Sequence, residues 1–299
     1  MNRPALRQHW AWVVTLVVLL GLYRGTDAAL VDTGNPNLVP SMLLLGSLVV
    51  PATFVSFARG WSGRQIVPAA TLWTAVLVGG AVGVVIAGVL EYNTVRRLGE
   101  IPMLGVGLIE EGTKLAVAAV FLLVLRRYTS MGAGILIGIA VGTGFAVLET
   151  MGYGFVTLIQ SGGNVGSVEQ TLFVRGVTSP AGHAAWTGLT CWGLWRFWHH
   201  PTGRRLFGFA GLFVVAVVLH ATWDTIGTPS SYVVLAVLSL GLLFIALRQA
   251  RRADEHLVAD PVPAGVRPSG YRPGYRADYR ADYGADYRAA DYRADYREL

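Results

Sequence analysis

Long apolar runs separated by short polar segments make up most of the first 250 residues of the chain. A helix rises about 1.5 Å per residue, so about 20 apolar residues cross the hydrocarbon core of a membrane. Eight runs are candidates: residues 9–23, 38–58, 66–92, 101–125, 131–159, 174–198, 206–227 and 232–250. The pattern therefore predicts an all-α, polytopic membrane protein with about eight transmembrane helices.

The first run allows two interpretations. It is short and follows Arg3 and Arg7, which is also the pattern of a signal peptide. Arg24 follows the run directly and no clean Ala-x-Ala cleavage site is evident, which favours a retained helix. The sequence alone leaves the signal-peptide alternative open.

Composition supports a membrane protein. Apolar residues are 53% of the chain and charged residues only 14%, against about 25% in soluble proteins. Residues 251–299 contain nine of the 24 basic and nine of the 18 acidic residues, so the net charge of +6 belongs to residues 1–250. The basic residues of that part lie in short segments between apolar runs. We therefore expect the lipid bilayer as a partner, and no nucleic acid.

The last 49 residues have a different character. Variants of Tyr-Arg-Ala-Asp repeat from Tyr271 onward, after a segment rich in Pro and Gly. Such a segment has too few aliphatic residues to offset the entropy lost on ordering. The sequence thus predicts a membrane domain at 1–250 and a disordered cytoplasmic tail at 251–299. An interaction or tyrosine-modification segment is the functional alternative for this tail.

Arginine placement predicts the orientation in the membrane. With eight helices and a cytoplasmic N-terminus, twelve arginines outside the tail repeats fall on the cytoplasmic side. Four fall on the other side: Arg24, Arg96, Arg97 and Arg175. Cytoplasmic loops carry the excess of Lys and Arg in membrane proteins. Both termini are therefore expected in the cytoplasm.

Seven ionisable residues lie inside the apolar runs and away from their ends, where a charge costs about 3 kcal/mol or more and needs a partner or a function. They are Glu110, Glu111, Lys114, Glu149, His183, His220 and Asp224. Lys114 is the only lysine in the chain and is three and four residues from the two glutamates, within reach on one helix face. Four helices carry these residues at roughly 10–15 Å below the outer boundary, so they can meet in one site.

The residue types in this group suit several kinds of chemistry. Two imidazoles and several carboxylates can bind zinc and polarise a water, and a carboxylate can also activate water without a metal. The same residues can relay protons in a transporter, or simply join helices through ion pairs. Gly134, Gly138 and Gly142 form a small-residue stripe that favours close helix packing.

Three motifs carry a resemblance to a known family. Glu110-Glu111-Gly-Thr-Lys114 fits EExxK, Phe145-Ala-Val-Leu-Glu149 fits FxxxE, and His220-Ala-Thr-Trp-Asp224 fits HxxxD. In this order, on successive apolar runs, they resemble the PrsW family of intramembrane proteases, which is related to the CAAX prenyl protease and bacterial Abi group. The resemblance covers about residues 101–227, the expected catalytic core.

The resemblance implies a protease in a bacterial-type plasma membrane that cuts a membrane-protein substrate, such as an anti-sigma factor, near the extracytoplasmic face. It implies that Glu110 or Glu111 activates the attacking water and that Lys114 holds the paired carboxylate. Glu149, His183 and His220 would be zinc ligands or water-positioning groups, and Asp224 would orient His220. A non-catalytic membrane scaffold and a proton-coupled transporter are the alternatives. The complete motif set and the absence of repeated halves argue against them.

Overall fold

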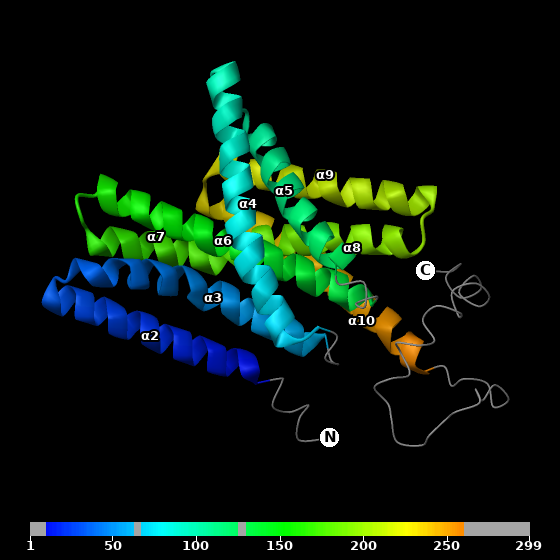
Figure 1. The fold of residues 1–299 in the computed structure, drawn as a ribbon, viewed down its shortest axis with the longest axis horizontal. Coiled ribbons are helices and arrows are strands. Elements are labelled where there is room, and N and C mark those ends of the chain that lie inside the picture. Colours follow the sequence, from blue (N-terminus) through cyan, green and yellow to red (C-terminus); the bar gives the residue numbers. More distant parts are fainter. Residues whose placement is uncertain (1–9, 63–66, 125–129, 260–299) are drawn as a thin grey trace. The chain divides into compact units, whose positions relative to one another are not determined.

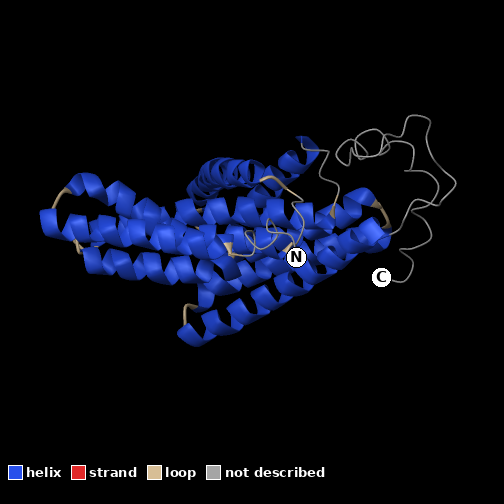
Figure 2. Ribbon diagram, turned by 90° about the horizontal axis from the view of Figure 1, so that it is seen from below, coloured by secondary structure: helices blue, strands red, loops and turns tan. Residues whose placement is uncertain are grey.

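The protein is described by a computed structural model, which covers residues 10–62, 67–124 and 130–259 (Figure 1). The helices are, in chain order, α2 (Ala11–Thr33), η1 (Pro36–Leu38), α3 (Val39–Trp61), α4 (Ala69–Leu98), α5 (Met103–Val124), α6 (Met131–Gln160), α7 (Val165–Thr178), η2 (Ser179–Ala181), α8 (His183–His199), α9 (Gly203–Ile226) and α10 (Pro229–Ala259). Over these residues there is no β-strand (Figure 2). The all-α prediction is confirmed.

Helix α6 lies at the centre of the helix assembly. It contacts α3, α4, α5, α7 and α8, and nearly all of its apolar stretch is buried. The main hydrophobic core surrounds it, and a smaller apolar cluster joins α2, α3 and α7. Since α6 carries Glu149, the central helix holds one of the predicted site residues in a crowded interior.

Glycines allow α6 to approach its neighbours closely. A Cβ at Gly138 would lie 2.6 Å from the Thr187 carbonyl oxygen of α8, and a Cβ at Gly134 would lie 2.8 Å from the Trp195 ring. On the opposite side, a Cβ at Gly80 of α4 would lie 2.5 Å from the Gly144 carbonyl oxygen. The predicted role of the small-residue stripe in close packing is confirmed.

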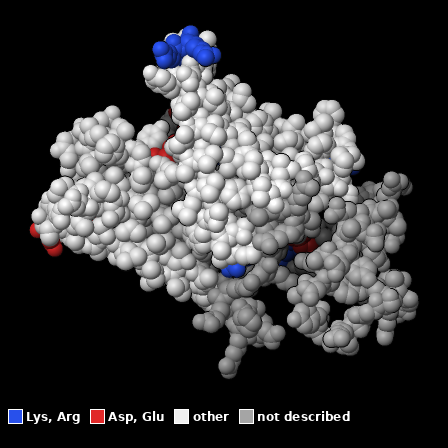
Figure 3. All heavy atoms as spheres, viewed as in Figure 1, with Lys and Arg blue, Asp and Glu red and all other residues white. Residues whose placement is uncertain are grey.

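Six segments are long and apolar enough to cross a membrane by length and composition: Ala11–Thr33, Pro36–Trp61, Ala69–Leu98, Met131–Gln160, Gly203–Ile226 and Pro229–Asp254. Helix α5 is outside this set and carries three charged residues, and α8 has only 17 residues. Large apolar side chains are exposed along α2, α4, α9 and α10, as expected for lipid contact. On the face drawn in Figure 3, charged side chains are few, and a basic group marks the end of α4, whose last turn contains Arg96 and Arg97.

The prediction of one helix over residues 174–198 is wrong. The chain there forms the end of α7, the 3₁₀ turn η2 and then α8. Pro180 lacks a backbone N–H and so disfavours the continuation of α7, and Gly182 has φ −95° and ψ −119°, which is not helical. His183 is therefore the first residue of α8 and not an interior position of a longer helix.

The first helix is longer than predicted. It continues to Thr33, so Arg24 lies within α2 and not in an outer loop. Arg24 pairs with Asp27 at 3.2 Å and with Glu169 of α7 at 2.9 Å. Arg175 lies in the last turn of α7. The ion pairs of Arg24 stabilise its charge within α2, beyond the end of the predicted apolar run.

Helix α10 also extends past the predicted run and ends at Ala259. Its Asp254 accepts hydrogen bonds from the backbone N–H groups of Met131 and Gly132, both at 3.0 Å, at the start of α6. The disordered tail is predicted for residues 251–299, but residues 251–259 form the end of α10, and the remaining residues 260–299 lie outside the described residues. The same holds for Arg3, Arg7, Arg64, Arg126 and Arg127, which contribute to the predicted orientation.

Candidate metal centre

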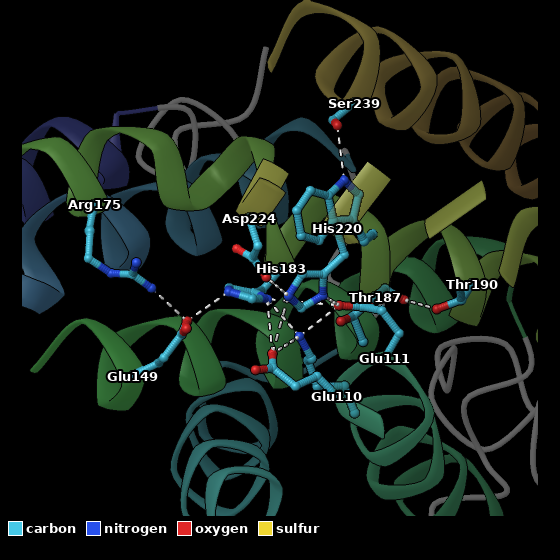
Figure 4. Close-up of polar contacts among 12 residues, drawn as sticks. Glu110, Glu111, Glu149, Arg175, His183, Thr187, Thr190, His220, Asp224 and Ser239 are labelled. Carbon is cyan, nitrogen blue, oxygen red and sulfur yellow. Dashed lines mark hydrogen bonds and ion pairs between the residues drawn. The ribbon is translucent and has the colours of Figure 1, made fainter. Parts of the chain in front are cut away.

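Four helices bring the predicted site residues together (Figure 4). Helix α5 contributes Glu110, Glu111 and Lys114, and α6 contributes Glu149. Helix α8 begins at His183, and α9 contributes His220 and Asp224 from its last two turns. All seven residues are linked by hydrogen bonds or ion pairs.

Lys114 is the centre of the buried charges. Its Nζ lies 2.7 Å from Glu111 Oε1, 3.2 Å from Glu110 Oε2 and 2.6 Å from His183 Nδ1. The side chain is fully buried, and the ammonium also lies 4.2 Å from the centre of the Phe145 ring. The three-residue and four-residue spacing on α5 thus places both carboxylates on one ammonium, as the sequence predicts.

His220 is held by two carboxylates and a stacked ring. Its Nδ1 lies 2.9 Å from Glu111 Oε1, and its Nε2 lies 3.2 Å from Asp224 Oδ2, one helical turn away. Trp186 stacks on the imidazole with a centroid distance of 5.0 Å. The Trp186 indole N–H donates to Ser239 Oγ of α10 at 2.9 Å, which fixes the orientation of the indole. These contacts leave His220 little rotational freedom.

His183 is held from the other side of the site. Its Nε2 lies 2.8 Å from Glu149 Oε2, and the same oxygen lies 2.9 Å from Arg175 of α7. The Arg175 guanidinium also lies 3.8 Å from the centre of the Tyr153 ring. Glu149 therefore fixes the His183 ring, and Arg175 in turn fixes Glu149.

Glu110, His183 and His220 form a group that could hold a metal ion, since one ligand atom from each lies within 4.8 Å of the others. We call these three residues the metal group. Glu110 Oε2 lies 3.6 Å from His220 Nε2 and 4.0 Å from His183 Nδ1. Each imidazole has its second nitrogen on a separate carboxylate, Glu149 or Glu111. This is the outer arrangement that orients histidine ligands in metal sites.

The charge of the cluster also fits a divalent cation. Glu110, Glu111, Glu149 and Asp224 are four carboxylates, and over the described residues Lys114 and Arg175 are the permanent cations paired with them. With both imidazoles neutral, the carboxylates exceed these cations by two charges, which a divalent cation would balance. A metal at His183 Nδ1 would replace the contact with Lys114, whose ammonium keeps its two carboxylates.

A pocket reaches this site from the surface. It encloses about 580 Å³, including its mouth. Its lining includes His183 and His220 of the metal group, together with Glu149, Asp224 and Arg175. The walls come from α6, the α7–η2–α8 segment, α9 and the start of α10. A ligand in this pocket would touch the imidazoles without passing the buried Lys114.

The comparison with known protein families decides the assignment. A family model described as PrsW family intramembrane metalloprotease matches residues 67–248, more than half of the chain. The chain belongs to the PrsW family. No curated protein and no solved structure matches the chain significantly.

Membership of the PrsW family confirms the resemblance that the three motifs carry. The matched region begins before α4 and contains all seven predicted site residues. As a PrsW-family metalloprotease with several membrane-crossing helices, the chain is a multi-pass membrane protease. It acts in the membrane, so its substrate is a membrane protein and its environment is lipid.

Two features of the PrsW site add to what the sequence predicts. Glu149, expected with the histidines as a metal ligand, lies outside the metal group and contacts His183 and Arg175; Glu110 belongs to the group. The sequence assigns Arg175 only to the outer side of the membrane and does not predict its contact with Glu149. The sequence Ser-Pro-Ala-Gly at 179–182 is a helix-breaking signal that locates Arg175 in the last turn before a break at the site.

Proposed function

We propose that this PrsW-family protein is a zinc-dependent endopeptidase that cuts a single-pass membrane protein close to the extracytoplasmic face. One observation carries the proposal. Each imidazole of His183 and His220 is held by its own carboxylate and has its other nitrogen facing Glu110. Two imidazoles and one carboxylate form the ligand set of a large class of catalytic zinc sites.

Glu110, His183 and His220 would hold the zinc ion. When bound, zinc would supply a Lewis acid that polarises the scissile carbonyl and makes water more acidic. Glu111 would orient the His220 ring by accepting a hydrogen bond from its Nδ1, and Glu149 would orient the His183 ring through its contact with Nε2 at 2.8 Å. Lys114 balances Glu110 and Glu111, which lets three charged side chains remain in a buried site.

We propose that Asp224 is the general base that activates the attacking water. This carboxylate lines the pocket and lies 3.2 Å from His220 Nε2. Glu111 is fully buried and bonded to Lys114 and His220, and Glu110 belongs to the metal group. We therefore prefer Asp224 to the two glutamates that the family resemblance favours. A carboxylate in this place accepts the proton of water as its oxygen attacks the carbonyl.

We place the cut on the extracytoplasmic side. The arginine distribution favours cytoplasmic termini, which puts the start of α5 and the end of α9 outside. Glu110 and His220 are then about 10 Å below those helix ends. Peptide bonds near the interface leave helical pairing more easily than those at the midplane, where unpaired backbone groups cost several kcal/mol. An anti-sigma-factor-like protein with one membrane segment is the substrate class that the family suggests.

Metal analysis combined with a cleavage assay tests the proposal. The protein is purified in detergent, its metal content is measured by mass spectrometry, and cleavage of a candidate single-pass protein in liposomes is followed with and without 1,10-phenanthroline. We expect about one zinc per chain and loss of cleavage with the chelator. Glu110→Gln should lose zinc and activity, whereas Asp224→Asn should retain zinc and lose activity.

The outcomes separate the parts of the proposal. Full cleavage by the metal-free protein would show that water is activated without zinc. Full cleavage by Asp224→Asn would return the role of base to Glu110 or Glu111. Products cut on the cytoplasmic side of the substrate would reverse the proposed orientation.

A further inference from the structure

The wall of the pocket formed by the end of α7 and by η2 contains hydrogen-bond donors without partners. Ser179 is only 6% exposed, and its Oγ has no hydrogen-bond partner among the described residues. The Nε of Arg175 is buried and has no partner in the same part of the chain. Both residues line the pocket that reaches His183. Buried polar groups are paired in nearly all native structures, so two unpaired donors in one pocket wall require an explanation.

The neighbouring hydroxyl shows that pairing within the helix is available there. Thr178 lines the same pocket, but its Oγ1 donates to the carbonyl oxygen of Val174 at 2.8 Å and also approaches that of Arg175 at 3.3 Å. Ser179, one residue further along, begins the 3₁₀ turn that Pro180 imposes and makes no such bond. The break therefore separates a paired hydroxyl from an unpaired one.

The guanidinium of Arg175 is oriented by its other contacts. One terminal nitrogen lies 2.9 Å from Glu149 Oε2, and the plane lies over the Tyr153 ring. Figure 4 shows Arg175 approaching Glu149 from the side of the site opposite Glu111. These contacts use one edge of the guanidinium, while Nε remains available as a directed donor. Since Glu149 also contacts His183, the free donor belongs to a side chain that is tied to the metal group.

The substrate of a membrane protease supplies groups that match these donors. A segment that unwinds for cleavage loses its helical hydrogen bonds, and each exposed carbonyl oxygen then needs a donor. We propose that Arg175 Nε and Ser179 Oγ form a subsite that donates hydrogen bonds to main-chain carbonyl oxygens of the substrate and holds it extended beside His183. This subsite rests on the proposed function of the same site and adds a substrate-binding role for the broken helix.

The two donors would bind the main chain of an unwound peptide segment, whatever its side chains. Arg175 and Ser179 are four residues apart, where α7 passes into η2, so they follow one side of the pocket wall. Donors to the main chain select an extended backbone, and the apolar rings of Trp186 and Trp223 in the same pocket suit apolar substrate side chains. A helical segment keeps its carbonyls paired and gains nothing from these donors.

Binding of small peptide probes tests the subsite without measuring cleavage. The probes are benzyloxycarbonyl-leucine hydroxamate, the matching leucine amide, which lacks the metal-binding group, and acetohydroxamate, which lacks the peptide. Their affinities for the detergent-solubilised protein are measured by calorimetry. Ser179→Ala and Arg175→Lys should each weaken both leucine probes by about 3-fold to 10-fold, the usual contribution of one hydrogen bond. Acetohydroxamate should bind all variants equally.

Two controls keep the result specific. Thr178→Val removes a hydroxyl from the same wall that is already paired, so it should leave the affinity for the leucine probes unchanged. Ser179→Ala removes a buried, unpaired hydroxyl, so its unfolding temperature should equal or exceed that of the wild type. Arg175→Lys keeps a cation for Glu149 but removes the Nε donor.

The outcomes separate this inference from the proposed metal site. Failure of acetohydroxamate to bind the wild type would count against the metal site, and the leucine amide would then decide on the subsite alone. Equal affinity of wild type, Ser179→Ala and Arg175→Lys for both leucine probes would overturn the subsite. Equal weakening by Thr178→Val would show a general disturbance of the wall and would also overturn it.

Discussion

Lys114 shows how a single residue makes a cluster of buried charges stable. The chain uses arginine at 23 positions and lysine only here, where a compact ammonium fits between Glu110, Glu111 and His183. A guanidinium is planar and larger, and it would not fit a fully enclosed point between three acceptors. The requirement is one of size and shape, so charge alone does not explain the choice.

Replacement of Lys114 tests this pairing. Lys114→Met leaves two carboxylates buried without a cation, and loss of one member of a buried ion pair costs about 3–5 kcal/mol. We expect a large drop in the unfolding temperature in detergent. The double variant Lys114→Met/Glu111→Gln should recover part of the loss, because it removes one of the stranded charges. A Lys114→Met protein as stable as the wild type would contradict the pairing.

Glu149 lies beside the metal group without belonging to it. It contacts His183 on Nε2, whereas Nδ1 of the same ring faces Glu110, so we expect Glu149 to act through the orientation of the His183 ring. Glu149→Gln should therefore weaken zinc binding by about 10-fold to 100-fold without abolishing it, as is usual for outer partners of histidine ligands. Competition with a chromogenic chelator measures the affinity.

Glu169→Gln is the matched control for this change. Glu169 also pairs with an arginine, but that arginine is Arg24 of α2, and neither residue lines the pocket. Zinc affinity should remain at the wild-type value in Glu169→Gln. Complete loss of zinc in Glu149→Gln would make Glu149 a ligand, as the family resemblance implies.

At the scale of elements, the contact between α6 and α8 positions His183. A Cβ at Gly142 of α6 would overlap the His183 carbonyl oxygen and lie 2.9 Å from Thr187 Oγ1. Gly142→Ala should therefore push the start of α8 away, with a cost of about 1–3 kcal/mol for overpacking. Both the unfolding temperature and the zinc affinity should fall.

Gly152→Ala provides the control on the same helix. A Cβ there meets nothing within 4 Å, and alanine favours a helix by about 1 kcal/mol over glycine. This variant should be as stable as the wild type or more stable, with unchanged zinc affinity. If both variants behave alike, close packing at Gly142 does not position His183.

The same element scale explains which parts of the site could be predicted. Glu110, Glu111 and Lys114 lie within one turn of α5, so helical spacing alone brings them together. The contact between Glu149 and Arg175 joins α6 to α7 and depends on how the chain turns between residues 160 and 165. Hydropathy averages over the Pro180 break, so the apolar run at 174–198 is continuous in the sequence pattern and the helix break beside Arg175 is not predicted. Spacing thus predicts the contacts within α5, and the similar depth of the ionisable residues predicts that four helices meet in one site. The contact between Glu149 and Arg175 could not be predicted in this way.

For the whole molecule, the long apolar runs predict the class of fold well, because each membrane crossing needs a long apolar segment. The ends of the helices are less predictable, since α2 and α10 continue through charged residues that have polar partners in the folded protein. Arg24 meets Asp27 and Glu169, and Asp254 meets the start of α6. A single sequence shows the charges but not their partners. The predicted helices 1 and 8 therefore end too early.

Asp254 connects the last helix to the central helix, and this contact gives the final prediction. Its two carboxylate oxygens accept hydrogen bonds from the backbone N–H groups of Met131 and Gly132. Ser130 Oγ accepts a hydrogen bond from the backbone N–H of Ala133 at 3.2 Å. Three of the four unpaired amides at the start of α6 are thus satisfied. A negative charge there also interacts favourably with the helix dipole.

Truncation after Arg252 should therefore destabilise the protein, although the sequence places the start of the tail at 251. Loss of the Asp254 cap costs about 0.5–2 kcal/mol of stability. Asp254→Ala in the full chain should therefore lower the unfolding temperature about as much as the truncation after Arg252 does. Truncation after Ala259 keeps the cap and removes only the repeat segment, which has few residues that could stabilise a core. It should leave thermal stability in detergent and cleavage unchanged. If both truncated proteins are as stable as the full chain, Asp254 contributes nothing to α6. If both are equally less stable than the full chain, the segment after Ala259 has a structural role.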